Sequence, residues 1–168
     1  MNTSAQAYML DTNVFDRVLD GEISISSFGG HRLLVTGIQR DELSKAQDPR
    51  RTALLATFEA ISPEVGLASS FALDIEGAGW GQAYWNDGSG NFQKMRKRLQ
   101  ALDPKNKHPL NQERDILIAE TAIKNGVTLV SDDRNLRQVV SEVRRLRHRV
   151  DEVVRATHQN RFDPILRG

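Results

Sequence analysis

Short, continuous apolar runs alternate along this chain with longer stretches in which apolar positions recur at helical spacing. The runs at 7–10, 32–36 and 127–130 are predicted strands. The longer stretches predict helices at 14–20, 38–47, 51–61, 92–102 and 112–125, and a last one from 135 to about 156. Continuously apolar strands are typical of parallel sheets that are buried on both faces. The pattern therefore predicts an α/β fold, a three-layer α/β/α sandwich with a mostly parallel central sheet.

Glycine, proline and capping residues set the expected ends of these elements. Gly21 is expected to end the first helix, and 24–30 is expected to be a loop. Asn111 is a predicted N-cap for the helix at 112–125, which Gly126 ends. Segment 63–111 is the least periodic part and has too few apolar residues for a core of its own. We therefore predict one domain over 1–168, with an elaboration at about 63–111 and a basic helical C-terminal stretch at about 134–161.

Composition excludes several classes of protein. The chain of 168 residues has no cysteine, which rules out disulfide scaffolds, thiolate metal sites and cysteine nucleophiles. The four histidines are scattered without the spacing of a zinc site. No window approaches the roughly 18 apolar residues of a membrane span, and the first residues lack the pattern of a secretory leader. A cytoplasmic protein without a membrane segment is the expectation.

The formal net charge of +1 hides a strong asymmetry. Eight arginines lie between Arg134 and Arg161, against only three acidic residues. A second basic cluster includes Arg96, Lys97 and Arg98. Charge separated in this way favours a polyanionic partner, although a solvated helix face would give the same pattern.

Acidic residues follow two of the predicted strands and stand near the start of two predicted helices. Asp11 follows the first strand, Asp132 and Asp133 follow the third, and Glu42 and Asp115 lie near the starts of helices. In parallel sheets these positions share the carboxyl edge, where sites form. Gathered carboxylates repel one another, and a hard divalent cation such as Mg²⁺ or Mn²⁺ resolves that repulsion. Such a cation can activate water against a phosphodiester.

Simpler interpretations exist for the same acids. Asp11 could be only a helix N-cap. Asp41 lies beside Glu42, and adjacent helical residues point about 100° apart, so only one of them can face the site. Asp132 could be a second ligand or a cap for the last helix. Glu120 lies too far round its helix from Asp115 to share its face, and is predicted to lie on the surface or to support the site indirectly.

Four segments together resemble the motifs of PIN-domain nucleases. Met9-Leu10-Asp11-Thr12-Asn13-Val14 is similar to the opening motif, and Glu42 within Gln39-Arg40-Asp41-Glu42-Leu43 to the second acidic position. The run from Arg114-Asp115-Ile116 to Ala122 resembles the third motif. Ser131-Asp132-Asp133-Arg134 resembles the last, in which Ser or Thr, one residue, and Asp follow a strand.

The resemblance implies a magnesium- or manganese-dependent ribonuclease. The catalytic acids would be Asp11, Glu42, Asp115 and Asp133, with Asn13 and Ser131 supporting them. Asp132, which lies beside Asp133, is a further expected metal ligand that the resemblance does not itself supply. The expected contacts to RNA phosphates are Arg96, Lys97, Arg98, Arg134 and Arg137. Many members of this family are toxins of toxin–antitoxin pairs and often dimeric, so an antitoxin partner and a homodimer are further expectations.

Two other functions compete with this interpretation. A phosphatase of the haloacid dehalogenase type would use Asp11 as its nucleophile, but it needs an acid two residues later, where this chain has Asn13. A non-catalytic RNA-binding module would use the basic clusters alone. The aromatic residues Trp80, Tyr84, Trp85 and Phe92 could stack on bases in either kind of RNA-binding protein, or form a small satellite core.

Overall fold

The structure is a computed structural model that describes residues 6–61, 90–105 and 109–146. Its strands are β1 (Ala7–Leu10), β2 (Arg32–Leu34) and β3 (Thr128–Val130). Its α-helices are α1 (Thr12–Leu19), α2 (Gly37–Ser44), α3 (Arg50–Ile61), α4 (Asn91–Leu102), α5 (Pro109–Lys124) and α6 (Arg134–Leu146). The predicted satellite of Trp80, Tyr84 and Trp85 lies outside the described residues, as does the part of the last helix beyond 146.

The three strands form one parallel sheet in the order β2-β1-β3. Met9 of the central strand is opposite Leu34 on one side and Leu129 on the other. Every residue of β3 is buried, as is every residue of β1 after Ala7. This explains why the runs are continuously apolar, since a sheet covered on both faces has no polar side.

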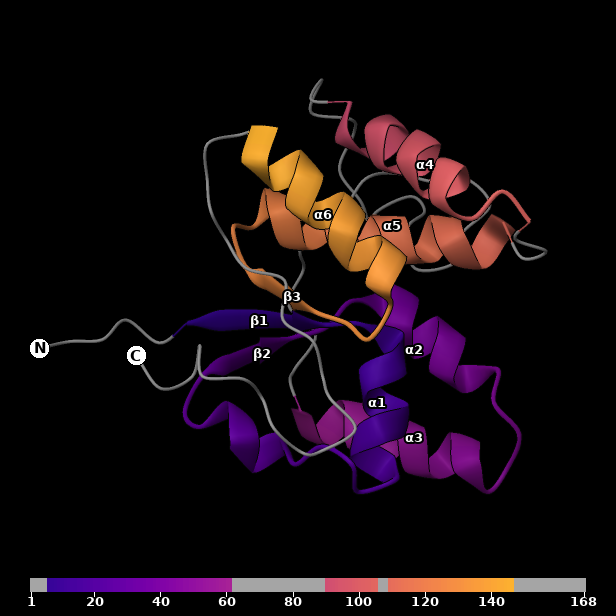
Figure 1. Cartoon of the computed structure of the whole chain (residues 1–168). Coiled ribbons are helices and arrows are strands. Elements are labelled where there is room, and N and C mark those ends of the chain that lie inside the picture. Colours follow the sequence, from indigo (N-terminus) through magenta and orange to yellow (C-terminus); the bar gives the residue numbers. More distant parts are fainter. Residues whose placement is uncertain (1–5, 62–89, 106–108, 147–168) are drawn as a thin grey trace, which may run out of the picture.

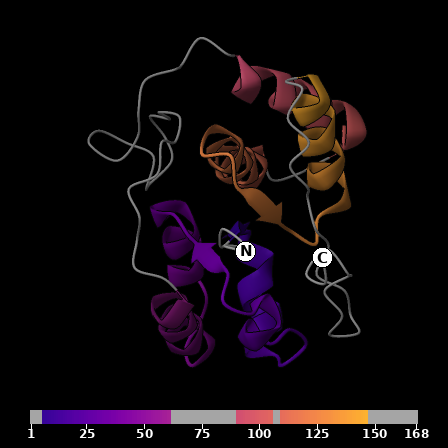
Figure 2. The same ribbon diagram turned by 90° about the vertical axis from the view of Figure 1, so that its left-hand side faces the viewer.

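Helices cover both faces of the sheet, with α4, α5 and α6 on one side and α1 and α3 on the other (Figures 1 and 2). Successive side chains of a strand point to opposite faces. Met9 therefore packs in a cluster with α4, α5 and α6, whereas Tyr8 and Leu10 pack in a second cluster with α1 and α3. The predicted α/β class and its parallel, three-layer arrangement are confirmed.

Two local predictions, the N-cap at Asn111 and the loop at 24–30, are wrong. Helix α5 begins at Pro109, so Asn111 lies inside the helix and is not its N-cap. Proline is favoured in the first turn because its missing N–H has no intrahelical partner there and its φ angle already suits a helix. Segment 24–30, expected to be a loop, contains a 3₁₀ turn, η1 (Ile25–Phe28), which Ser24 caps.

Glu120 does not lie on the surface, because its side chain is 1% exposed between α4 and α5. The start of α4 has Gly90 at its N-cap, with no side chain to accept the free N–H groups. Glu120 Oε1 accepts from the backbone N of Phe92 at 3.2 Å, and Lys124 Nζ lies 3.8 Å from the same oxygen. Glu120 therefore caps a helix that is distant in sequence, a role that the spacing within its own helix could not reveal.

No helix within the three described ranges is long and apolar enough to cross a membrane.

Candidate functional site

The carboxyl ends of β1 and β3 form the point of the sheet where the chain leaves in two directions. Helix α1 follows β1 onto one face, and α6 follows β3 onto the other (Figure 1). These two strands are neighbours in the sheet, and the helices that follow them lie on opposite faces. The connections therefore diverge at the carboxyl ends of β1 and β3, and in open α/β sheets sites form at such a point. Asp11 and the segment 131–133 stand at this point.

Asp11 is buried and accepts hydrogen bonds on both carboxylate oxygens. Its Oδ1 accepts from the backbone N of Thr12 at 2.9 Å, which makes Asp11 the N-cap of α1. Its Oδ2 accepts from Asn13 Nδ2 at 2.8 Å and from Ser131 Oγ at 2.5 Å. Capping and a place in an acidic site are therefore compatible roles for Asp11, since one oxygen caps the helix and the other faces the loop after β3.

Asn13 and Ser131 join the two strand ends. Asn13 Oδ1 accepts from the backbone N of Asp132 at 3.1 Å, while Asn13 Nδ2 donates to Asp11. Ser131 Oγ accepts from the backbone N of Asp133 at 3.1 Å and donates to Asp11. Asn13 therefore contacts both Asp11 and Asp132, and Ser131 contacts both Asp11 and Asp133.

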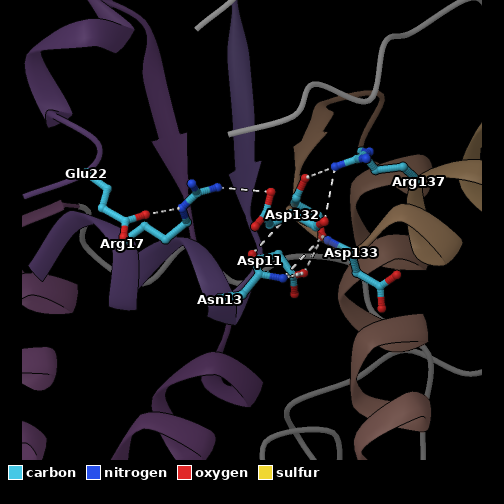
Figure 3. A network of polar contacts seen from close by, with 8 residues as sticks. Asp11, Asn13, Arg17, Glu22, Asp132, Asp133 and Arg137 are labelled. Atoms are coloured by element: carbon cyan, nitrogen blue, oxygen red, sulfur yellow. Dashed lines mark hydrogen bonds and ion pairs between the residues drawn. The ribbon is translucent and has the colours of Figure 1, made fainter. Parts of the chain in front are cut away.

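The two acids after Ser131 point in different directions (Figure 3). Asp133 is the cap of α6, with its Oδ1 accepting from the backbone N atoms of Asn135 at 2.7 Å and Leu136 at 3.0 Å. The carboxylate of Asp132 faces Arg17, whose Nη1 lies 3.0 Å from Asp132 Oδ1. Asp133 therefore caps α6, a role that the sequence also allowed for Asp132.

Glu42 and Asp41 are also separated by the fold. Thr12 Oγ1 donates a short hydrogen bond to Glu42 Oε2, which places Glu42 beside Asp11. Asp41 instead pairs with Lys45, the C-cap residue of its own helix, and its Oδ2 lies 3.6 Å from Arg114 Nη2 of α5. Of the two adjacent acids, Glu42 is the one held at the strand ends.

Four carboxylates lie close together at this edge, and burial together with their negative charges raises the pKa values of Asp11 and Asp115. Burial, with the charges of Glu42 and Asp133, raises the pKa of Asp11 to about 6, although the hydrogen bonds from Ser131 and Thr12 lower it. Burial raises the pKa of Asp115 to about 9, together with the charges of Asp11, Glu42 and Asp133, which Arg114 opposes. Burial likewise raises the pKa of Glu42. The structure brings together the acids from all four predicted segments.

The donor set suits a hard divalent cation, because it consists of carboxylate oxygens and because a bound cation would favour the ionised forms of Asp11, Glu42 and Asp115, whose pKa values are raised. Within the described ranges, no three acidic, histidine or cysteine side chains are already arranged to hold a metal ion. Magnesium is commonly bound through one or two carboxylates and retains several waters, so its binding does not need such a group. The carboxylates of this edge fit that mode of binding.

Three of the five predicted RNA contacts have partners within the chain. Arg96 Nη2 lies 2.8 Å from Glu113 Oε1, and Arg98 makes a two-pronged pair with Glu142 at 2.7 and 3.0 Å. Both pairs hold α4 against its neighbouring helices. Arg137 Nη1 donates to the carbonyl oxygens of Ser131 and Asp132 at 3.1 and 3.2 Å. The other two predicted contacts, Lys97 and Arg134, are exposed.

Sequence reasoning missed three residues that organise this edge. Thr12 holds Glu42, and Gln39 Nε2 donates to the carbonyl oxygen of Leu10 at 2.6 Å, tying the start of α2 to the end of β1. Arg17 holds Asp132. Two of them had a signal in the sequence. Arg17 lies four residues after Asn13 and so shares its face of α1. Gln39 stands three residues after Thr36, which is the spacing of a capping box and places Gln39 in the first turn of a helix.

No protein-family model matches the chain, and no curated protein matches it. Among solved structures, the chain is similar to the crystal structure of VapBC2 from Rickettsia felis bound to a DNA fragment from their promoter. The match has 14% sequence identity and a TM-score of 0.38, and it covers 80% of this chain and 93% of that chain. At this identity and TM-score, the likeness assigns neither a family nor an activity to the chain.

Proposed function

We propose that this protein is a metal-dependent nuclease that hydrolyses phosphodiester bonds of RNA. The observation that carries the proposal is the meeting of Asp11, Glu42, Asp115 and Asp133 at one edge of the sheet, from four separate segments. Carboxylates that outnumber the positive side chains near them in this way are typical of sites for Mg²⁺ or Mn²⁺. The choice of RNA as substrate rests on the resemblance of the same four segments to PIN-domain nucleases.

Asp11, Asp115 and Asp133 would hold the cation, directly or through the waters that Mg²⁺ retains, with Glu42 beside them. When bound, the cation supplies an activated water and stabilises the charge that develops on the phosphate. The chain's own residues supply the positioning. Asn13 and Ser131 fix Oδ2 of Asp11, and Thr12 fixes Oε2 of Glu42. The capping bonds of Asp133 occupy its Oδ1 and fix the direction of its other oxygen.

The test compares RNA cleavage by wild type, Asp11→Asn and Asp115→Asn, with Mg²⁺, with Mn²⁺ and with a chelator. Asp16→Asn is a matched control, since Asp16 lies on α1 as an exposed partner of Arg50. We expect cleavage by wild type and by the control only when metal is present, and none by the two site variants. Full activity of both site variants, or cleavage in the chelator, would contradict the proposal.

The same preparations separate the competing functions. Trapping of a phosphoryl-enzyme on Asp11 would support a phosphatase. The structure disfavours that chemistry, because Asn13 stands where a second acid is needed and its side chain is engaged with Asp11 and Asp132. RNA binding without cleavage under any metal condition would instead support a non-catalytic RNA-binding module.

A narrower form of the proposal makes this nuclease the toxin of a toxin–antitoxin pair, an expectation from the family resemblance. Expression of wild type should then arrest growth, and expression of Asp11→Asn should not. Co-expression of a small protein encoded next to the gene should relieve the arrest and co-purify with the chain. Normal growth on expression of a chain that is active in vitro would exclude the toxin role.

A further inference from the structure

A buried arginine lies beside the acidic edge and takes no part in the carboxylate group itself. The side chain of Arg17, on α1, is 8% exposed. Its Nε lies 2.8 Å from Glu22 Oε2, and its Nη1 lies 3.0 Å from Asp132 Oδ1 (Figure 3). One guanidinium therefore joins the end of α1 to the loop that follows β3, more than 100 residues away in the sequence.

Burying this ion pair costs desolvation energy, and a buried pair commonly adds little net stability over apolar residues of the same size. Its best-supported effect is to specify one arrangement, because each charge is strongly unfavourable without its partner. The side chain of Asp132 is 26% exposed, and its carboxylate is directed at Arg17 (Figure 3).

The loop at Asp132 is held from both faces of the sheet. Asn13 and Arg17, both on α1, bind the backbone N and the carboxylate of Asp132. From the other face, Arg137 of α6 donates to the carbonyl oxygens of Ser131 and Asp132. Asp132 lies between Ser131 and Asp133, the two residues of the loop that face the site. A fixed position of Asp132 therefore also restricts the positions of Ser131 and Asp133.

We propose that Arg17 is a positioning residue for the acidic site and that Asp132 is its anchor, not a metal ligand. Arg17 holds the Asp132 carboxylate away from Asp11. The same pair sets the loop so that Ser131 reaches Asp11 and Asp133 reaches the carboxylate group. This inference rests on the proposed metal-dependent function, which it deepens by separating the residues that would bind the cation from those that place them.

The test measures Mn²⁺ affinity of the full chain by electron paramagnetic resonance of free Mn²⁺. The chains compared are wild type, Arg17→Met, Asp132→Asn and the double variant. Residues that orient metal ligands typically change metal affinity by 10–100-fold, so we expect each single variant to bind about tenfold more weakly. If the two residues act as one unit, the double variant should lose no more than the worse single variant.

A metal ligand at position 132 would give a different pattern. Arg17→Met would then leave Mn²⁺ affinity unchanged or increase it, because it releases a carboxylate toward the site. Effects of the two single changes that multiply in the double variant, to about 100-fold, would show independent action. Either pattern would overturn the inference.

Arg50→Met is the matched control. It removes an exposed arginine that pairs with Asp16 of α1 and with Asp20 at the C-cap of α1, and it should leave Mn²⁺ affinity at the wild-type level. Asp132→Asn guards against a folding defect, because Arg17 then keeps its pair with Glu22.

A second readout needs no metal. The backbone amides of Asp132 and Asp133 donate to Asn13 and Ser131 in wild type. If Arg17 sets the position of this loop, Arg17→Met should weaken both hydrogen bonds. The two amides should then exchange with solvent at least tenfold faster than in wild type. Unchanged exchange would overturn the inference.

Failure of the proposed function gives a separate result. If wild type and Asp11→Asn bind Mn²⁺ equally poorly, the metal site itself is wrong, and faster exchange in Arg17→Met would still show the positioning of the loop. If Asp11→Asn abolishes binding while Arg17→Met binds like wild type, only the present inference fails.

Discussion

Replacing Asp11 by Asn should stabilise the metal-free protein at pH 8 but not near pH 4.5. Burial, together with neighbouring negative charge, raises the pKa of Asp11 from 3.8 to about 6 in the folded chain. A carboxyl with a raised folded pKa is ionised more readily in the unfolded chain, so it lowers stability as pH rises. This cost is nearly absent below about pH 4, grows between about pH 4 and 6, and is constant above that range.

The size of the effect follows from the shift and from the hydrogen bonds of Asp11. A rise of about 2 pKa units corresponds to about 3 kcal/mol of lost stability above pH 6, which Asn does not lose. Asn can still accept from the Thr12 amide, but its NH₂ group then faces the donors Asn13 Nδ2 and Ser131 Oγ. That mismatch costs about 1–2 kcal/mol. The net gain at pH 8 is therefore about 1–2 kcal/mol.

Urea unfolding in the presence of a chelator, at pH 4.5 and at pH 8, measures this difference. We expect Asp11→Asn to be the more stable chain at pH 8 and no more stable than wild type at pH 4.5. Added Mg²⁺ at pH 8 should stabilise wild type and leave the variant unchanged. A variant that is less stable than wild type by the same amount at both pH values would refute the reasoning, because Asp11 would then carry no electrostatic cost.

Three further changes have definite expected outcomes. Thr12→Val removes the hydroxyl that donates to Glu42, so the rate of RNA cleavage at saturating Mg²⁺ should fall about tenfold or more, with little change in the urea midpoint. A wild-type rate would show that this contact is dispensable. Glu120→Ala should lower the free energy of unfolding in urea by about 1–3 kcal/mol, because it removes the acceptor for the backbone N–H of Phe92 at the start of α4. A decrease below about 0.5 kcal/mol would contradict the capping role of Glu120. Gly126→Ala should lower the free energy of unfolding by about 1 kcal/mol in thermal unfolding, because the φ angle of Gly126, 65°, is in the left-handed region. An added Cβ has no atom within 4 Å, so a much larger decrease would contradict backbone strain as the cause.

The elements of this fold were predictable where one local pattern decided them. All three predicted strands are present, because a sheet buried on both faces requires the continuous apolar runs that the sequence shows. The ends of helices were harder to predict. Asn111 is a good capping residue, yet the helix starts earlier, at Pro109, because both residue types favour a helix start and the pattern alone does not choose between them.

The candidate site divides in the same way. An acid directly after a strand marks the sheet edge, so the place of Asp11 followed from its position in the chain. The choice between Asp41 and Glu42 depended on a threonine from another segment, and the direction of Asp132 depended on Arg17. Neighbouring residues along a chain share the same local signals, and only their distant partners distinguish them.

The sequence by itself determined the α/β alternation and the order in which four acidic segments arrive at one edge, because strand direction and apolar periodicity are properties of the local chain. The tertiary structure alone decided which carboxylates face one another and which are held away by arginine. It also decided that Glu120 caps a helix and that Arg96 and Arg98 pair within the protein. The physical reason is that hydrogen bonds and ion pairs act between atoms a few ångströms apart, and in this chain those atoms come from segments separated by up to about 120 residues.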